Sequence, residues 1–212
     1  MISSHERGFV FVATRMTAAP AVEIALSRVC GPDDVITPLP ERDEVLRRAA
    51  GGRGPQHFLD PPHLGRRAAL HMPLSAVHRM LGPDELERRF CFAVDRNPWD
   101  AVVALYHRRY RDTEPEDFAE YVASDAVVAF AARNHRAYRL RGRVAVDRVL
   151  RYESLAADLA DVWRHLDLPG TPELPRVAER TRPSYRSYYD QASRDRVAEL
   201  FADPIRELGY SF

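Results

Sequence analysis

Short apolar runs alternate with amphipathic segments along the chain. The first run, residues 8–13 (GFVFVA), is rich in β-branched and aromatic side chains, which predicts a buried strand. Residues 89–94 and 146–151 predict two further strands by the same pattern. Helical spacing predicts helices over residues 20–29, 41–50, 74–81, 84–89, 100–111, 115–123, 125–138, 155–166 and 193–208. Strands that alternate with helices predict an α/β fold with a parallel sheet, and the absence of repeats predicts a single domain over residues 1–212.

The connection after the first strand is the first candidate for chemistry. Residues 14–19 join the strand to a helix that has Pro20 in its first turn, where the missing N–H costs nothing. A strand, a short loop and a helix form the layout of a phosphate-binding βα unit.

Charge and hydropathy exclude several classes of protein. The 212 residues carry 31 Lys+Arg against 31 Asp+Glu, so the chain lacks the positive field of a nucleic-acid or anionic-membrane binder. No apolar run of about 18 residues is present, and the N-terminus has no signal-peptide pattern. We therefore expect a cytoplasmic protein with no nucleic-acid or membrane partner, in which any anion site is local.

The numbers of cysteines and lysines exclude several kinds of site. Cys30 and Cys91 are too few for a disulfide framework or a structural zinc site, so no metal is expected. All 31 basic residues are arginines. The chain therefore has no lysine for a Schiff base or for a phosphate-binding loop.

Residues 92–106 (FAVDRNPWDAVVALY) resemble the hallmark of bacterial and carbohydrate-type sulfotransferases, in which a strand leads through an Arg-Asn-Pro-Trp-Asp turn into a helix. Residues 30–38, 151–155, 185–190 and 201–212 also resemble that family. The resemblance implies the sulfotransferase fold, a P-loop-like three-layer α/β/α arrangement with a central parallel sheet. It also implies the donor 3′-phosphoadenosine 5′-phosphosulfate (PAPS), bound at the first βα loop near a helix N-terminus.

The resemblance implies roles for residues of the nucleotide site. Arg96 matches the arginine that holds the 3′-phosphate. The late basic and aromatic segment matches the part of the family that closes over the nucleotide. Its members are Arg180, Arg182, Arg186, Tyr185, Tyr188 and Tyr189.

The first loop departs from the family pattern. That pattern is approximately Pro-Lys-Thr-Ala-Gly-Thr-Ser, and residues 15–21 here are RMTAAPA. Met16 has no charge to stabilise a leaving oxygen, so Arg15 is the candidate replacement, and Thr17 keeps a hydroxyl. Whether PAPS or its product nucleotide still binds stays open. The other departures are Ala19, Pro20, Ala21 and, at the serine position of the second motif, Ala104.

The acceptor side matches the family better. His71 falls where the family has its catalytic histidine before a short helix, so it is the candidate general base. A surface or helix-capping role for His71 stays open, and His63 is the nearest rival. Arg151 and Glu153 act near the site or form a structural ion pair.

Two further roles concern the helix after the second strand. Asp100 is expected to cap the helix that begins there. The arginines at residues 108, 109 and 111 line an anion site or form a solvated face.

Three functions follow. The first is a sulfotransferase-family enzyme that transfers a sulfuryl group from PAPS to a hydroxyl or amine of a small molecule or sugar. The second is an enzyme of the same fold that no longer uses PAPS and performs acid/base or elimination chemistry in the acceptor cleft. The third is a catalytically silent binding protein. The acceptor is a small molecule or sugar, and a homodimer is an open alternative for the oligomeric state.

Overall fold

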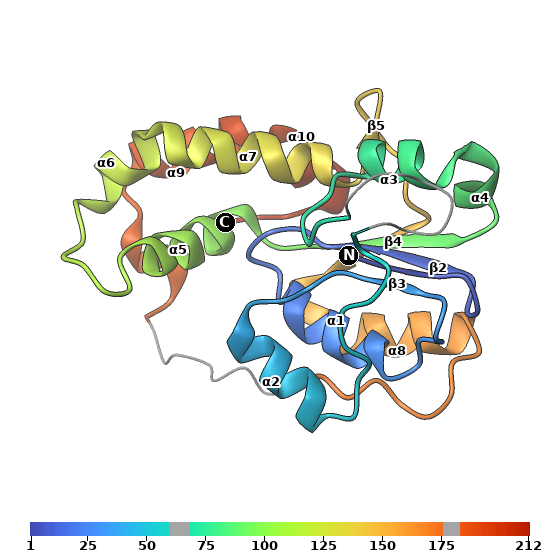
Figure 1. Cartoon of the computed structure of the whole chain (residues 1–212). Coiled ribbons are helices and arrows are strands. Elements are labelled where there is room, and N and C mark those ends of the chain that lie inside the picture. The colour runs from blue at the N-terminus through green and yellow to red at the C-terminus, as the bar shows by residue number, and fades with distance from the viewer. Residues whose placement is uncertain (60–67, 176–182) are drawn as a thin grey trace. The chain divides into compact units, whose positions relative to one another are not determined.

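The computed structural model describes residues 1–59, 68–175 and 183–212 (Figure 1). These residues form two compact units. Among the described residues, unit 1 contains 1–59, 68–95 and 136–175, and unit 2 contains 96–135 and 183–212. His63, Arg180 and Arg182 lie outside the described residues. The single-domain expectation stays a prediction.

Unit 1 is built on a five-stranded sheet in the order β3-β1-β2-β4-β7. The three longer strands, β2 (Phe9–Val12), β4 (Phe90–Asp95) and β7 (Arg148–Arg151), run parallel as predicted. Strands β1 (Ile2–Ser4) and β3 (Val35–Ile36) were not predicted, and β1 is antiparallel to both of its neighbours. The protein is therefore an α/β protein with a mostly parallel sheet.

Helices cover both faces of this sheet. Helices α1 (Ala19–Ser27) and α8 (Leu155–His165) pack on one face, and α2 (Glu41–Ala49) lies against α1. Helices α3 (Leu74–Leu81) and α4 (Pro83–Glu87) pack on the opposite face (Figure 1). A short 3₁₀ helix, Tyr152–Ser154, joins β7 to α8. Unit 1 has the three-layer arrangement that the family resemblance implied.

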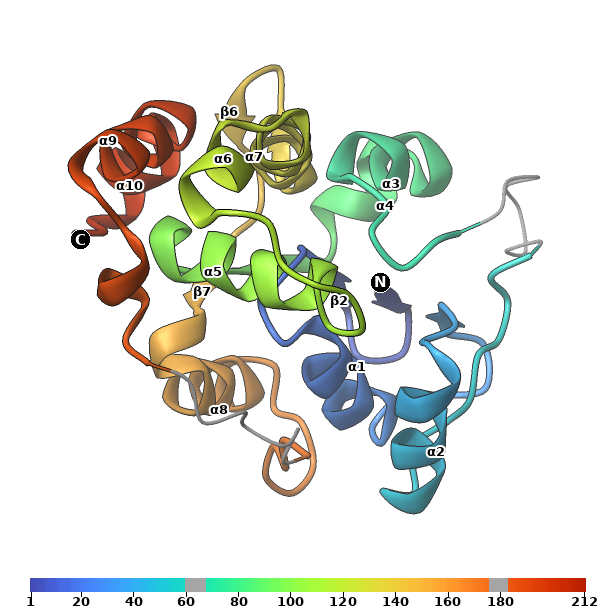
Figure 2. The same ribbon diagram turned by 90° about the vertical axis from the view of Figure 1, so that its left-hand side faces the viewer.

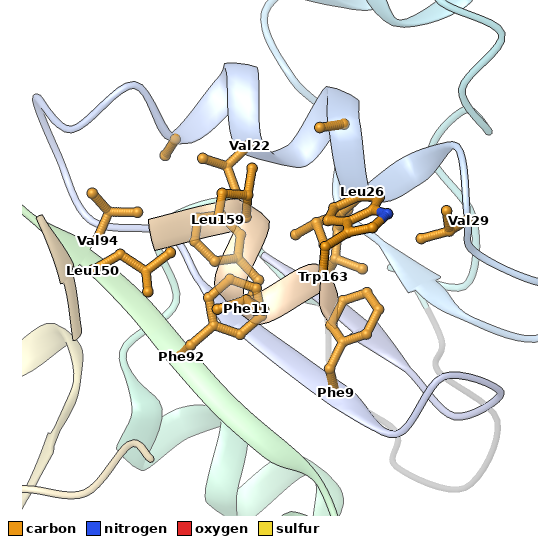
Figure 3. Close-up of a cluster of buried hydrophobic side chains, with 14 of the residues drawn as sticks. Phe9, Phe11, Val22, Leu26, Val29, Phe92, Val94, Leu150, Leu159 and Trp163 are labelled. Atoms are coloured by element: carbon orange, nitrogen blue, oxygen red, sulfur yellow. The ribbon is translucent and has the colours of Figure 1, made fainter. Parts of the chain in front are cut away.

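The alternation of side chains along β2 explains the two cores. Phe9 and Phe11 point to α1 and α8 and pack with Phe92 and Trp163 (Figure 3). Val10 and Val12 pack on the other face, in the cluster with α3. A central parallel strand is buried on both faces, which is why residues 8–13 form a continuous apolar run.

A hairpin and a buried charge network complete unit 1. Strands β5 (Arg139–Leu140) and β6 (Arg143–Val144) form a separate two-stranded sheet. Glu23 on α1 is fully buried and accepts hydrogen bonds from the Met1 α-amino group and from Arg47, 3.3 Å away. Burial raises the pKa of Glu23, and the two cations oppose that shift.

Unit 2 is helical in the residues that the structure describes (Figure 2). Its elements are α5 (Pro98–Arg109), α6 (Phe118–Ala123), α7 (Asp125–Ala137, of which the last two residues belong to unit 1), a 3₁₀ helix (Tyr185–Tyr188), α9 (Gln191–Leu200) and α10 (Ala202–Leu208). The prediction of one helix over residues 193–208 was wrong, because α9 ends at Leu200 and α10 follows Phe201. Pro204 has no N–H to donate to the Leu200 carbonyl, and its ring clashes with a carbonyl at that position of a continuous helix.

Candidate functional site

Polar residues gather where the parallel strands of unit 1 end. Strand β2 leads into Thr14, β4 ends at Asp95 and β7 ends at Arg151. Asp95 and Arg151 are register partners across β4 and β7. Ligands of α/β proteins bind outside the carboxyl ends of the strands. This carboxyl edge, formed by residues 13–18, Asp95 and Arg151, is therefore the candidate site.

Two buried threonines fix the loop between β2 and α1. The Thr14 hydroxyl donates to the carbonyl oxygen of Val94 on β4. Because Thr14 has one hydroxyl hydrogen, Thr17 is the donor in the 2.8 Å hydrogen bond between the two hydroxyl groups. Thr17 is also 3.3 Å from the carbonyl oxygen of Thr14. The Thr17 hydroxyl therefore braces the loop, and its contact with a donor nucleotide stays a prediction.

The backbone of this loop has an unusual conformation. Met16 and Ala18 have φ values of 64° and 57°, in the left-handed region that non-glycine residues rarely adopt. Ala18 is the N-cap of α1, and the Ala21 N–H donates to its carbonyl oxygen at 2.9 Å. Pro20 has no N–H. The first turn of α1 therefore offers an anion fewer amide donors than an ordinary helix N-terminus.

The structure brings His71 to the same loop. Its Nδ1 atom lies 3.0 Å from the carbonyl oxygen of Ala13, the first residue after β2. A carbonyl only accepts hydrogen bonds, so Nδ1 carries the proton and Nε2 carries the lone pair of the neutral ring. The N-cap of α3 is Pro73, so His71 does not cap that helix. His71 and the first βα loop, inferred separately from the sequence, are neighbours in unit 1.

Asp95 and Tyr138 are candidate site residues that sequence reasoning missed. The Tyr138 hydroxyl donates to the Asp95 carboxylate. Tyr138 is 1% exposed and Asp95 is 9% exposed. A hydrogen bond of this kind stabilises a buried carboxylate. The available signal was an aspartate directly after an apolar strand pattern, because that position lies at the carboxyl edge of a parallel sheet.

Arg96 lies in unit 2, in the turn before α5. Its Nε and Nη2 atoms lie 2.7 and 2.5 Å from Oδ2 of Asp100. The expectation that Asp100 caps the helix was wrong, since the Asn97 side chain is the N-cap and accepts from the Trp99 N–H at 3.1 Å. Asp100 instead neutralises much of the charge of Arg96.

The Arg-Asn-Pro turn and the late segment meet within unit 2. The Asn97 amide donates to the Tyr185 hydroxyl at 3.5 Å and to the carbonyl oxygen of Ser211 at 2.9 Å. The guanidinium carbon of Arg186 lies 5.1 Å from the centre of the Tyr185 ring. Tyr185 and Arg186 therefore lie beside the turn that contains Arg96, and their role in nucleotide binding stays a prediction.

Two structural features bear on partners. Among the residues that the structure describes, no group of three or more His, Cys, Asp or Glu side chains is arranged to hold a metal ion. No helix in the described ranges has both the length and the apolar character needed to cross a membrane.

The fold and the carboxyl edge define the class as an α/β protein with a mostly parallel sheet and a structured first βα loop. No family model matches the chain. An uncharacterized protein from Archaeoglobus fulgidus is 32% identical over 103 residues, which cover 46% of this chain and 84% of that protein. The chain therefore belongs to the same family as this archaeal protein. A crystal structure of a sulfotransferase from Alicyclobacillus acidocaldarius is similar at 19% identity and a TM-score of 0.40, over 92% of this chain and 95% of that chain.

Proposed function

We propose that the protein is a sulfotransferase-family enzyme with an altered donor site, which transfers a sulfuryl group from PAPS to a hydroxyl or amine of a small molecule or sugar. The proposal rests on the resemblance of residues 92–106 to the family. The observation that carries it is the 3.0 Å contact between Nδ1 of His71 and the Ala13 carbonyl oxygen. This contact holds the candidate base beside the loop that corresponds to the family's donor loop.

The proposed reaction uses His71 as general base. Its Nε2 atom takes the proton of the acceptor hydroxyl while the acceptor oxygen forms a bond to sulfur. The bond between sulfur and the bridging phosphate oxygen breaks, and the electron pair leaves with adenosine 3′,5′-bisphosphate. Because the chain has no lysine, Arg15 is proposed to stabilise the charge on the leaving oxygen.

Roles in nucleotide binding are proposed residue by residue, separately for each unit. Thr17 belongs to the loop of unit 1, and Arg96, Arg186 and Tyr185 belong to unit 2, with Arg182 outside the described residues. These assignments come from the family resemblance. The ion pair between Arg96 and Asp100 limits the charge that Arg96 offers to a phosphate.

A second function is favoured by a specific observation at the donor loop. Met16 provides no charge, and Pro20 removes an amide donor from the first turn of α1. Both changes weaken the binding of an anion at this loop, whereas the candidate base His71 is still held against the Ala13 carbonyl oxygen. The alternative is therefore an enzyme of the same fold that performs acid/base or elimination chemistry without PAPS. A catalytically silent binding protein remains as the third function.

A thermal shift experiment separates these functions. At about one hundred times its Kd, a bound ligand adds roughly 2.7 kcal/mol, on the order of 5 to 10 °C for a chain of this size. The first function predicts such a shift with adenosine 3′,5′-bisphosphate and none with 5′-AMP. Arg96→Ala should abolish the shift. The control Arg196→Ala, which removes an exposed ion pair with Glu199, should keep it. No shift at millimolar nucleotide would leave the second function.

A further inference from the structure

Phe212 packs among aromatic rings from two other segments of unit 2. Its ring centre lies 5.6 Å from that of Trp99, in the first turn of α5. It lies 5.7 Å from the ring of Tyr185 and 5.6 Å from that of Tyr189, both on the late segment. In all three pairs the rings are nearly perpendicular, the edge-to-face geometry that aromatic side chains prefer. The Phe212 ring therefore joins the start of α5 to the late segment.

Hydrogen bonds hold the same three segments together. The Asn97 amide nitrogen donates to the carbonyl oxygen of Ser211 at 2.9 Å, and its oxygen accepts from the Trp99 N–H. The Tyr189 hydroxyl donates to the carbonyl oxygen of Trp99 at 2.9 Å. The turn before α5, the late segment and residues 211–212 are therefore fixed relative to one another within unit 2.

Two arginines with proposed roles in phosphate binding lie on the segments that Phe212 joins. Arg96 is held by Asp100, which lies in the first turn of α5. The guanidinium carbon of Arg186 lies 5.9 Å from the centre of the Phe212 ring and 5.1 Å from that of Tyr185. Aromatic rings attract a cation that lies over them, so the two rings hold this long, exposed side chain in place.

We propose that Phe212 is a positioning residue of the nucleotide site. Its ring fixes Arg186 relative to the turn that contains Arg96, so that both guanidinium groups bind phosphate groups of one adenosine 3′,5′-bisphosphate. An arginine that is already ordered loses less conformational entropy when a ligand binds, which strengthens binding. The inference rests on the proposed function, because it assigns a role within nucleotide binding.

Two substitutions at residue 212 test the proposal in the whole chain. Phe212→Leu keeps an apolar side chain but removes the ring, and its affinity for adenosine 3′,5′-bisphosphate in calorimetric titration should fall by about tenfold. Phe212→Tyr keeps the ring and should bind within about twofold of the wild type. Rescue by tyrosine distinguishes the aromatic ring from apolar packing, which leucine also supplies.

Phe201→Leu is the matched control. Phe201 is a buried aromatic residue of the same unit, and its ring packs against Phe130 on α7. This variant should lose at least as much free energy of unfolding as Phe212→Leu but keep its nucleotide affinity at a temperature where it is folded. If Phe212 had a structural role alone, the two leucine variants would lose stability and both would bind nucleotide as the wild type does.

Three results would overturn the inference while the proposed function stands. These are equal affinity of the wild type and Phe212→Leu, an equal loss of affinity in Phe201→Leu, and a loss in Phe212→Tyr as large as that in Phe212→Leu. If the wild type itself gives neither a thermal shift nor binding heat with the nucleotide, the proposed function fails and the inference fails with it. The two failures are distinguishable, because only the second abolishes the response of the wild type.

Discussion

The hydroxyl group of Tyr138 donates a hydrogen bond to the carboxylate of Asp95, the last residue of β4. Both side chains are almost fully buried, and Tyr138 packs in the core on the α3 face of the sheet. A carboxylate removed from water needs donors of this kind. The hydrogen bond therefore fixes the end of a central strand beside the first βα loop.

Removal of this hydroxyl group should destabilise the protein. Tyr138→Phe leaves a buried carboxylate without one of its donors, which costs about 1.5 to 3 kcal/mol in free energy of unfolding. Equilibrium unfolding in urea measures the loss. Tyr121→Phe is the control, because Tyr121 is as deeply buried and its hydroxyl makes no hydrogen bond within the described residues. That control should lose less than about 0.5 kcal/mol, and equal losses would contradict the role of the Asp95 contact.

Glu23 should contribute more to stability than an exposed glutamate in a similar ion pair. Glu23→Gln leaves the Arg47 guanidinium buried without its full countercharge, which should cost about 3 to 5 kcal/mol. Glu41 forms a 3.5 Å pair with Arg48 in which both side chains are mostly exposed, so Glu41→Gln should cost at most about 1 kcal/mol. Thermal or urea unfolding compares the two variants. Similar losses would show that burial does not set the contribution of Glu23.

The elements that the sequence predicted well have long, periodic patterns. Helix α3 has the predicted bounds of Leu74–Leu81, and β4 lies within one residue of its predicted range. Strands β1 and β3 have three and two residues, too few for a periodic signal, and they form because their backbones pair with each other and β1 with β2. Pro204 indicates the break between the two helices at Phe201. The spacing of apolar residues, used alone, does not predict this break.

The candidate site also contains residues that the sequence predicted and residues that it did not. The first βα loop and His71 were predicted from local patterns and from the family resemblance, and both lie at the carboxyl edge. Asp95 and Tyr138 are 43 residues apart. Only the tertiary packing of the segment after α7 against β4 brings them together, so no local pattern predicts the pair.

Restoring a charge at residue 16 should strengthen donor binding if the loop is a donor site. Met16→Lys adds an ammonium group, and a charged hydrogen bond contributes about 1.5 to 3 kcal/mol, which corresponds to roughly 10- to 150-fold in affinity. Met16 already has a positive φ, so lysine adds no new backbone strain. Calorimetric titration with adenosine 3′,5′-bisphosphate measures the change. Met16→Gln, similar in length but neutral, should bind as the wild type does.

His71 should act as a base rather than as a structural ligand of the loop. In His71→Asn the amide nitrogen takes the place of Nδ1 and can still donate to the Ala13 carbonyl oxygen, but the variant has no base at Nε2. We expect kcat to fall by about 10²- to 10⁴-fold while the thermal shift with adenosine 3′,5′-bisphosphate stays unchanged. Release of that nucleotide in the presence of acceptor measures kcat. His78→Asn on α3 is the control and should retain full activity, since His78 makes no side-chain hydrogen bond in the described residues. Full activity of His71→Asn would exclude the general base and leave His71 with a structural role.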